Sequence, residues 1–455
     1  MVLKSGWKTE GEVTETEDQV IVKLQSGLSI KYPREDVVRI IRKDTPQEIF
    51  ATKFKAVDRS SLAALEELAS WCRLNGLGAE AVQVANAMLK IDKDNSFAKE
   101  ILIRFKTTVE HIPPNKEREK SLLAEFGTGF HVYRSRHYRV CHNTDLEYAK
   151  ERARYFEVLY EQFYRHFDTV GMPMKFLEDR VEVILFRSRQ QYALYAGSRF
   201  PTLARTAGVY LMTDNRAVFF DAKGDAYYKG FQKQYSQYQR MLRNLRNSLA
   251  GMGKNTRIAL TFGDGRRETY DRNGLRRKIA QLQKEAHDSW DKFQKERQAA
   301  NLTTTMHECA HQLAFNLGIH PREYPVPKWL AEGVATFFEE TEPERKTKTT
   351  GLNARQLGVF RSVGTGGLRD LITNDEIWAH FDKATEAAYA RAWALFLYLS
   401  HQRQTALVQY LERMKKDTDK EDTAERRVQD FERAFGPLKA VQQRWQTYMT
   451  QVRAE

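Results

Sequence analysis

Short alternating runs of hydrophobic and polar residues open the chain. The run from Gln19 to Leu24 alternates, Ser26-Gly27 forms a turn signal, and Leu28 to Ile30 continues the pattern. Short apolar runs separated by turn residues are typical of β-strands. We therefore expect residues 1–45 to form a small β-barrel domain of SH3-like size.

A helical pattern follows the predicted strands. Its apolar positions recur every three or four residues, at Leu62, Leu65, Leu68 and Cys72. Asn75-Gly76 interrupts this run, and a second run from Ala81 to Leu89 resumes it. The pattern predicts a helical hairpin within residues 46–110, similar to a single tetratricopeptide repeat. Because one hairpin cannot bury its own apolar face, it should pack on a neighbour or bind a partner.

Strand-like and helical segments alternate in the rest of the chain. His111-Ile112-Pro113-Pro114 and the charged run Lys116 to Lys120 predict a linker. Beyond it, the pattern predicts strands and helices in the order strand, helix, strand, helix, hairpin, at 138–141, 145–167, 181–186, 188–195 and 209–220. Asp214-Asn215 supplies the hairpin turn. The pattern after the hairpin predicts mainly helices, so residues 121–455 should form one α+β domain.

Composition places the chain among ordinary globular proteins. Hydrophobic residues make up 41% and charged residues 29%, and no apolar run reaches the length of about 18 residues that spans a bilayer. Three cysteines are too few for a disulfide framework or a cysteine-based zinc site. The first residues, MVLKSGWKTEGEV, contain no apolar segment that predicts a secretory signal, although a trimmed secreted or periplasmic form would look the same. Neither the compartment nor the oligomeric state follows from the sequence.

Most of the positive charge lies in one segment. The net charge is +13, and residues 222–300 contain eighteen Lys or Arg against eight Asp or Glu, a net +10. We interpret this segment as a basic insertion. Between Tyr227 and Arg246 it also interleaves aromatic and cationic residues, as nucleic-acid surfaces do. No nucleic-acid-binding fold signature accompanies it, so acidic substrates or an anionic cell surface are favoured at least equally.

One pentapeptide carries the pattern of a metal site. His307-Glu308-Cys309-Ala310-His311 lies in a stretch from 302 to 317 without Pro or Gly, and Gly318 follows in the position of a helix C-cap. On a helix, His307 and His311 lie one turn apart and can bind one zinc ion, while Glu308 can reach a metal-bound water. Cys309 points to the other side of this helix, so we do not expect a catalytic thiol.

A second motif lies downstream, at Trp329 to Glu339, with the sequence WLAEGVATFFE. Together with H-E-x-x-H it resembles the gluzincin metallopeptidases, in which the glutamate before glycine is the third zinc ligand. The resemblance implies one zinc per chain, Glu332 as the third ligand, and Glu339 as the carboxylate that orients a zinc-bound histidine. It also implies a thermolysin-like catalytic domain with a helical C-terminal part.

The resemblance is closest to bacterial peptidase MA-like proteins of unknown function, and covers roughly residues 130–450. Further motifs that carry it are YARAW at Tyr389 to Trp393 and AFG at Ala434 to Gly436. It implies that Tyr389 donates a hydrogen bond to the oxyanion of the transition state, with Tyr324 and Tyr398 as rival donors. It also assigns the hairpin from Val209 to Phe220 to binding of an extended peptide.

The resulting hypothesis is zinc-dependent hydrolysis of peptide bonds in a peptide or protein substrate, with Glu308 as general base. The chain lacks a G-A-M-E-N-like segment, which favours an endopeptidase over an aminopeptidase. Two alternatives are a zinc-bearing domain that only binds peptides and a nucleic-acid-associated protein with a structural metal. Glu308 favours the enzyme, because a binding protein needs ligands but no general base.

Overall fold

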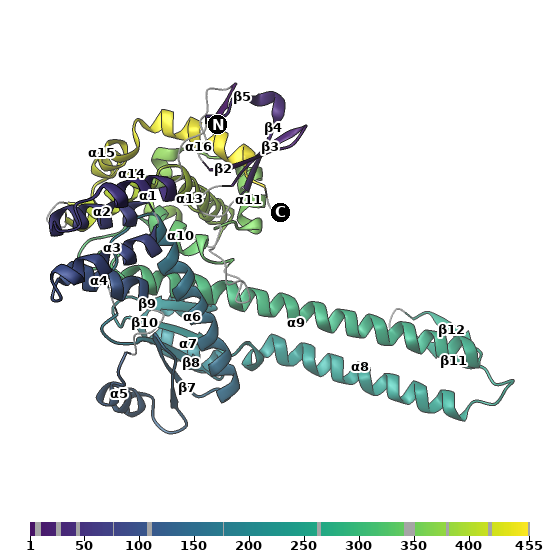
Figure 1. Cartoon of the computed structure of the whole chain (residues 1–455). Coiled ribbons are helices and arrows are strands. Elements are labelled where there is room, and N and C mark those ends of the chain that lie inside the picture. Colours follow the sequence, from purple (N-terminus) through teal and green to yellow (C-terminus); the bar gives the residue numbers. More distant parts are fainter. Residues whose placement is uncertain are drawn as a thin grey trace.

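The computed structural model describes residues 1–4, 11–23, 29–41, 46–75, 77–106, 112–175, 177–261, 265–340, 351–378, 382–416 and 421–453. Helices and small sheets are combined in a body from which one long helical arm projects (Figure 1). The expected α+β class is therefore confirmed. None of the helices in the described part of the chain has the length and apolar character needed to cross a membrane.

Five short strands lie near the amino terminus. They are β1 (Val2–Leu3), β2 (Glu12–Glu15), β3 (Gln19–Lys23), β4 (Ser29–Pro33) and β5 (Val37–Arg39), with the 3-10 helix η1 (Arg34–Asp36) before β5. β2, β3 and β4 form an antiparallel sheet, and β1 pairs with β5. Alternation on β3 buries Val20 and Val22. The expected turn at residues 26–27 lies outside the described residues.

Four helices follow these strands: α1 (Pro46–Ala56), α2 (Leu62–Leu74), α3 (Gly78–Ile91) and α4 (Ser96–Lys106). α2 and α3 pack against each other, and α4 packs on α3. Their buried apolar side chains, among them Leu65, Cys72, Val84 and Met88, form a cluster of their own. The hairpin thus buries its apolar face mainly against the flanking helices α1 and α4.

The charged run expected to be a linker is instead a helix, α5 (Lys116–Phe126). The Asn115 side chain accepts a hydrogen bond from the backbone N–H of Arg118, which caps the helix start. Leu122 anchors the helix because it is fully buried beside the central sheet. A charged run without Pro or Gly forms a helix readily once one face can be buried, so the body that contains the central sheet begins before residue 121.

A five-stranded sheet forms the centre of the body. Its strands are β6 (His131–Arg134), β7 (Tyr138–His142), β8 (Val181–Phe186), β9 (Gly208–Leu211) and β10 (Arg216–Phe220), in the order β6-β7-β8-β10-β9. β7, β8 and β10 are parallel, whereas the outer strands β6 and β9 are antiparallel to their neighbours. β9 is therefore an edge strand.

Both faces of this sheet are covered, so every residue of its inner strands β7, β8 and β10 is buried. One face packs on α6 (Leu146–Thr169) and on the helix that carries His307, and Val183 and Phe219 point to that side. The other face packs on α5 and α7 (Arg189–Arg199), and Ile184 and Val218 point there. The 3-10 helix η2 (Pro201–Arg205) connects α7 to β9.

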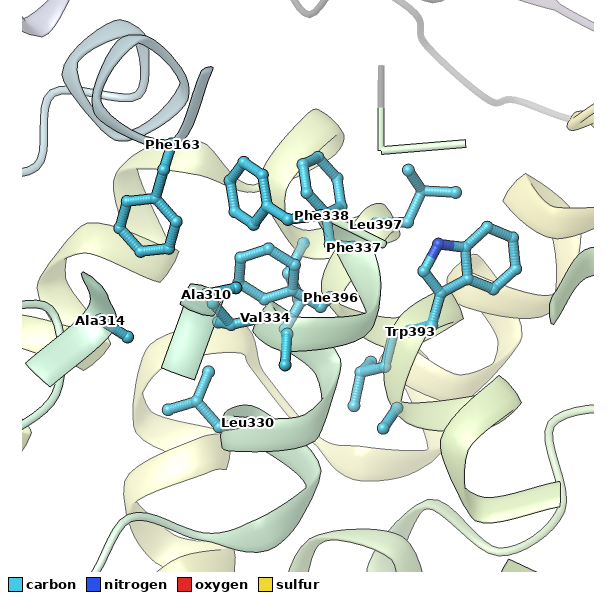
Figure 2. Packing of buried hydrophobic residues seen from close by; sticks show 14 of the residues in the cluster. Phe163, Ala310, Ala314, Leu330, Val334, Phe337, Phe338, Trp393, Phe396 and Leu397 are labelled. Carbon is cyan, nitrogen blue, oxygen red and sulfur yellow. The ribbon is translucent and has the colours of Figure 1, made fainter. Parts of the chain in front are cut away.

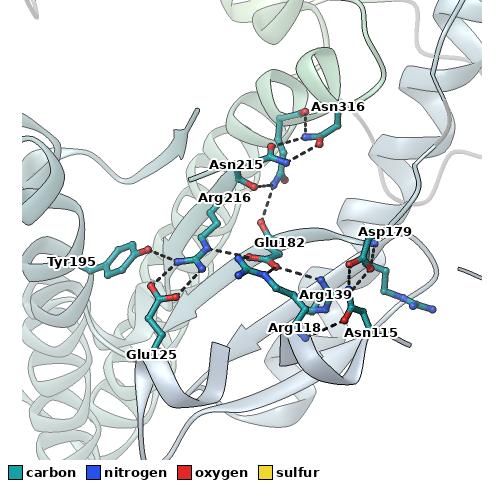
Figure 3. A network of polar contacts seen from close by, with 12 residues as sticks. Asn115, Arg118, Glu125, Arg139, Asp179, Glu182, Tyr195, Asn215, Arg216 and Asn316 are labelled. Carbon is teal, nitrogen blue, oxygen red and sulfur yellow. Dashed lines mark hydrogen bonds and ion pairs between the residues drawn. The ribbon is translucent and has the colours of Figure 1, made fainter. Parts of the chain in front are cut away.

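A network of charged side chains fixes α5 to the sheet (Figure 3). Glu182 on β8 is only 8% exposed and accepts hydrogen bonds from Arg118, Arg139 and Arg216. Arg216 also forms a bidentate pair with Glu125 of α5, at 2.6 and 2.8 Å. Buried charges of this kind need such pairing because desolvation is costly.

The basic insertion forms the arm. After the 3-10 helix η3 (Ala222–Gly224), α8 (Ala226–Gly251) runs outward, β11 (Ile258–Thr261) and β12 (Arg267–Tyr270) form an antiparallel ribbon, and α9 (Arg272–Asn316) returns (Figure 1). The basic insertion was predicted to end at residue 300, before the helix that carries His307, but α9 is one helix of 45 residues that spans both residue 300 and His307. No Gly or Pro stands between Gly274 and Gly318 to break it.

The remaining helices follow α9, and α10 packs directly on it. They are α10 (Lys328–Phe337), α11 (Ala354–Val363), α12 (Leu368–Thr373), the 3-10 helix η4 (Asp375–Trp378), α13 (Lys383–Gln402), α14 (Gln404–Lys416), α15 (Ala424–Phe435) and α16 (Leu438–Gln451). α10 and α13 are in extensive contact through apolar side chains such as Val334, Phe337 and Phe396 (Figure 2).

Gly333 allows α10 and α13 to approach closely. A β-carbon at this position would lie 2.8 Å from the backbone oxygen of Ala392 and 3.1 Å from the Cβ of Phe396. Any larger residue would therefore push the helices apart. This gives a packing reason for the Glu-Gly pair in the downstream motif, since Glu332 and Tyr389 lie on the two helices that meet here.

Candidate metal centre

Two helices bring the three expected ligands together. His307 and His311 lie one turn apart on α9, and Glu332 lies on α10. The Nε2 atoms of the two histidines are 3.2 Å apart, and Glu332 Oε2 is 3.1 Å from His307 Nε2 and 3.4 Å from His311 Nε2. Among the described residues, this is the one group of three or more His, Cys, Asp or Glu side chains that could hold a metal ion.

These separations fit a tetrahedral zinc ion. With zinc–ligand distances of about 2.0–2.2 Å, two ligand atoms on a tetrahedron lie about 3.3 Å apart. The three donor atoms converge on a common point at that spacing. Their side chains are 12%, 14% and 10% exposed, so the centre is nearly buried but still reaches the surface.

Glu339 orients the first histidine. Its Oε1 lies 2.8 Å from His307 Nδ1, and its Oε2 accepts a hydrogen bond of 2.9 Å from Asn353 Nδ2. A proton held on Nδ1 leaves Nε2 free to bind a metal, as in carboxylate–histidine–zinc arrangements. Glu339 does not lie on the helix of Glu332, because α10 ends at Phe337 and Glu339 lies in the following turn. The turn still directs its carboxylate to His307.

The charges of the centre are strongly coupled. Burial alone would lower the pKa of His307, but hydrogen bonds to Glu332 and Glu339 outweigh it and raise that pKa well above its usual value. Burial opposes ionisation of Glu332, yet the two histidines hold its pKa well below the ordinary range. The carboxylates of Glu332 and Glu339 therefore favour a positive charge beside them, which a divalent ion would supply.

Glu308 lies beside the ligands but is not one of them. Burial raises the pKa of its carboxyl group, and the nearby histidines oppose that shift. Its Oε2 accepts a hydrogen bond of 2.8 Å from the backbone N–H of Tyr210 on the edge strand β9. No hydrogen bond of Oε1 is seen among the described residues, so this oxygen is the free end of the carboxylate.

Tyr389 on α13 faces the same centre. Its ring lies 6.0 Å from the ring of His307 and packs edge-on against Trp378 at 5.0 Å. Burial is the main cause that raises the pKa of its phenol, and the negative charges of Glu332, Glu308 and Glu339 raise that pKa further. The phenol therefore stays protonated and available as a donor.

The rival tyrosines lie elsewhere. Tyr324 lies under the guanidinium of Arg426, and the Tyr398 ring packs 5.6 Å from that of Tyr448. The side chain of Cys309 is fully buried in the core on the far side of α9, as expected. Among the three candidate donors, only Tyr389 is in contact with a proposed ligand.

Three groups that contact the residues of the centre were not predicted from the sequence: Asn353, Trp378 and the backbone of Tyr210. Asn353 carries an ordinary helix-capping signal, because its side chain accepts from the N–H of Gln356 at the start of α11. That signal predicts a helix start but not a contact with Glu339. Trp378 and Tyr210 reach the centre only through tertiary packing, so local sequence patterns could not predict their contacts with it.

The fold and these side chains define a candidate two-histidine, one-carboxylate metal centre with an adjacent carboxylate and phenol. In comparisons with known proteins, residues 301–419 match a family described as a protein of unknown function (DUF1570). The matched segment contains His307, His311, Glu332, Glu308 and Tyr389. None of the curated proteins compared with the chain is similar to it in sequence.

Proposed function

We propose that this chain is a zinc-dependent endopeptidase with a thermolysin-like, gluzincin-type catalytic domain. The observation that carries the proposal is the position of Glu308. Its carboxylate is buried beside three converging ligand atoms, takes no part in ligation, and is held by the edge strand of the sheet. A purely structural metal centre has no use for such a group, whereas hydrolysis needs a general base.

The residues divide the chemistry among them. His307, His311 and Glu332 would hold the zinc ion, which when bound supplies a Lewis acid that polarises the scissile carbonyl and lowers the pKa of water. Because Tyr210 N–H occupies Oε2 of Glu308, the other oxygen, Oε1, accepts the proton of the attacking water and later delivers it to the leaving amine. Tyr389 donates a hydrogen bond to the oxyanion that forms.

β9 is proposed to bind the substrate. It is an edge strand, and its Tyr210 N–H points to Glu308 rather than to β10, so its open edge faces the metal centre. An extended peptide can add to such an edge through main-chain hydrogen bonds. This arrangement would place a scissile bond between the strand and the zinc ligands.

Chelation tests the proposed activity. The purified chain should cleave denatured proteins, lose that activity in a metal chelator, and regain it when zinc is restored. Cleavage would be measured as newly formed peptide termini by mass spectrometry. Chelator saturated with zinc beforehand is the control. Failure of the zinc-loaded chain to cleave any denatured protein, or cleavage unaffected by chelation, would rule out zinc-dependent hydrolysis.

Replacing Tyr389 with phenylalanine should lower kcat by about ten- to a thousandfold with little change in KM. The reason is that the hydrogen bond to the oxyanion forms only in the transition state. Steady-state kinetics on a defined peptide, with zinc content measured in parallel, would show this. Tyr324→Phe and Tyr398→Phe are matched controls and should leave kcat near the wild-type value. An unchanged kcat in Tyr389→Phe would assign the oxyanion to another donor.

The arm is proposed to attract acidic substrates. Residues 240–284 contain twelve Lys or Arg and three Asp or Glu. Several exposed cations form no ion pair with any described residue: Arg243, Lys254, Arg257, Arg267, Arg276 and Arg277. The aromatic residues that suggested nucleic-acid binding mostly pack within the arm instead, where Phe231 and Tyr235 of α8 stack on Phe293 and Trp290 of α9. They do not form an open stacking platform.

Neutralising Arg266, Arg267, Arg276 and Arg277 together should raise KM for acidic peptides and flatten its dependence on salt. Cations act at a distance by increasing the local concentration of anionic partners, and salt screens that effect. KM would be measured at several ionic strengths for acidic and neutral peptides. Neutralising four exposed cations nearer the body, Lys229, Lys233, Lys292 and Lys295, is the control. If only the control changed KM, the tip of the arm would have no role in substrate attraction.

A further inference from the structure

A row of polar side chains on α9 binds the β9–β10 hairpin. Glu308, Gln312 and Asn316 are spaced four residues apart and therefore lie along one side of the helix. Glu308 accepts from the N–H of Tyr210, Gln312 Nε2 donates to the backbone oxygen of Asn215 at 3.2 Å, and Asn316 bonds the Asn215 side chain. The helix that carries two zinc ligands thus also fixes the edge strand.

Asn215, in the turn between the strands, is the centre of these contacts (Figure 3). Its Oδ1 accepts hydrogen bonds from Asn316 Nδ2 at 2.8 Å, from the Tyr210 hydroxyl at 2.9 Å and from Arg322 Nη2 at 2.9 Å. Its Nδ2 donates to Asn316 Oδ1 at 2.9 Å. The reciprocal pair of amides joins the turn to the carboxyl end of α9.

The backbone at Asn215 is in an uncommon conformation. Its φ is +53°, and no other non-glycine residue among those described has a positive φ. Asparagine tolerates this left-handed region better than most residues, but the conformation persists only where its surroundings enforce it. Hydrogen bonds to the side chain of Asn215 and to its backbone oxygen supply that enforcement.

These contacts determine where the edge strand lies relative to the metal ligands. One end of the hairpin is held at Glu308 through Tyr210, and the other at Asn316 through Asn215. Contact between Gly208 and α9 adds to this: a β-carbon at Gly208 would lie 3.0 Å from Thr304 Cγ2 and 2.6 Å from the Phe219 ring. A shift of the turn would move Tyr210 N–H, and with it the carboxylate of Glu308.

We infer that Asn215 is a positioning residue, which aligns the edge strand and the proposed general base with the metal centre. It does so through its two reciprocal amide hydrogen bonds with Asn316, which we call the clasp. The kinetic part of this role rests on the proposed hydrolysis. The structural part does not, because the clasp is a property of the hairpin and α9 alone. A misplacement of about 1 Å in a catalytic group can lower a rate by about a hundredfold, so a loosened hairpin should reduce turnover.

Asn215→Gly is the variant of choice, because glycine adopts a positive φ freely and only the side-chain amide is lost. Asn316→Ala removes the same clasp from the other side without altering the turn. In both, kcat/KM should fall about ten- to a hundredfold at full zinc content, and hydrogen exchange of amides 208–215 should rise at least about tenfold. The double variant should be little worse than either single one, since both lose one shared interaction.

Two further variants complete the test. Asn215→Asp keeps an acceptor for Tyr210 and Arg322 and should retain more activity than Asn215→Gly. Asn374→Gly, in the turn after α12, controls for added backbone freedom and should change neither quantity. Unchanged exchange in Asn215→Gly and Asn316→Ala would overturn the clasp. Faster exchange with unchanged kcat/KM would reduce Asn215 to a structural residue. Absence of hydrolysis by the wild type would refute the proposed function alone, because exchange still reports on the clasp.

Discussion

Replacing Glu308 with glutamine is expected to lower hydrolysis by at least about a hundredfold while the chain keeps its zinc. Glutamine preserves the size of the side chain and an oxygen that can accept from Tyr210 N–H, so the edge strand should stay in place. It cannot take a proton from the attacking water, and general-base catalysis typically contributes about a hundred- to ten-thousandfold. Initial rates on one peptide, normalised to bound zinc, would measure the loss.

The control for this variant is Glu323→Gln, an exposed glutamate before α10. Its rate and zinc content should match the wild type. If Glu308→Gln cleaved as fast as the wild type, either another group would activate the water or the activity would come from a contaminant. If it lost zinc as well as activity, Glu308 would belong among the ligands, contrary to its position beside them.

Replacing His311 with alanine is expected to abolish tight zinc binding and, with it, activity. The wild type should bind one zinc per chain, because only one group of converging ligand atoms exists among the described residues. Loss of one of three protein ligands leaves a two-ligand site that cannot hold zinc tightly. Elemental analysis and competition with a chromogenic chelator would give stoichiometry and affinity.

His287→Ala is the matched control, since His287 lies on the same helix, is exposed, and pairs with Asp291 far from the ligands. It should bind zinc like the wild type. A wild-type chain that binds no zinc, or a His311→Ala variant that binds it equally well, would remove the basis of the proposed centre and of the hydrolysis that depends on it.

Local patterns predicted many of the elements. The strand at 181–186 and the hairpin strands near 209–212 and 217–220 correspond closely to β8, β9 and β10. The helix containing His307 was also expected, because side-chain periodicity and the lack of Pro or Gly are properties of the segment itself. For the centre, the spacing of His307 and His311 on one helix indicated a shared face, and resemblance supplied Glu332, Glu339 and Tyr389.

Features that depend on distant segments were not predicted. The length of α9 was missed because its polar outer part packs on α8, and its inner part lies in the body, so one helix carries two different patterns. The cluster around Glu182 joins β7, β8, β10 and α5, and nothing in any single segment indicates it. Asn215 gave only a turn signal, although its contacts reach Asn316 and Arg322, about a hundred residues later.

Because α9 is uninterrupted, it fixes the direction in which the tip of the arm faces relative to the candidate metal centre. A helix turns by about 100° and rises about 1.5 Å per residue, so the thirty-five residue steps from Arg272 to His307 carry the tip about 50 Å outward. One residue added or removed along that stretch would rotate the basic tip by about 100° relative to the open side of the centre. Insertions or deletions in α9 should therefore be tolerated in steps of about seven residues, because about two full turns return the tip to its original orientation. A change of the same length would be needed in α8.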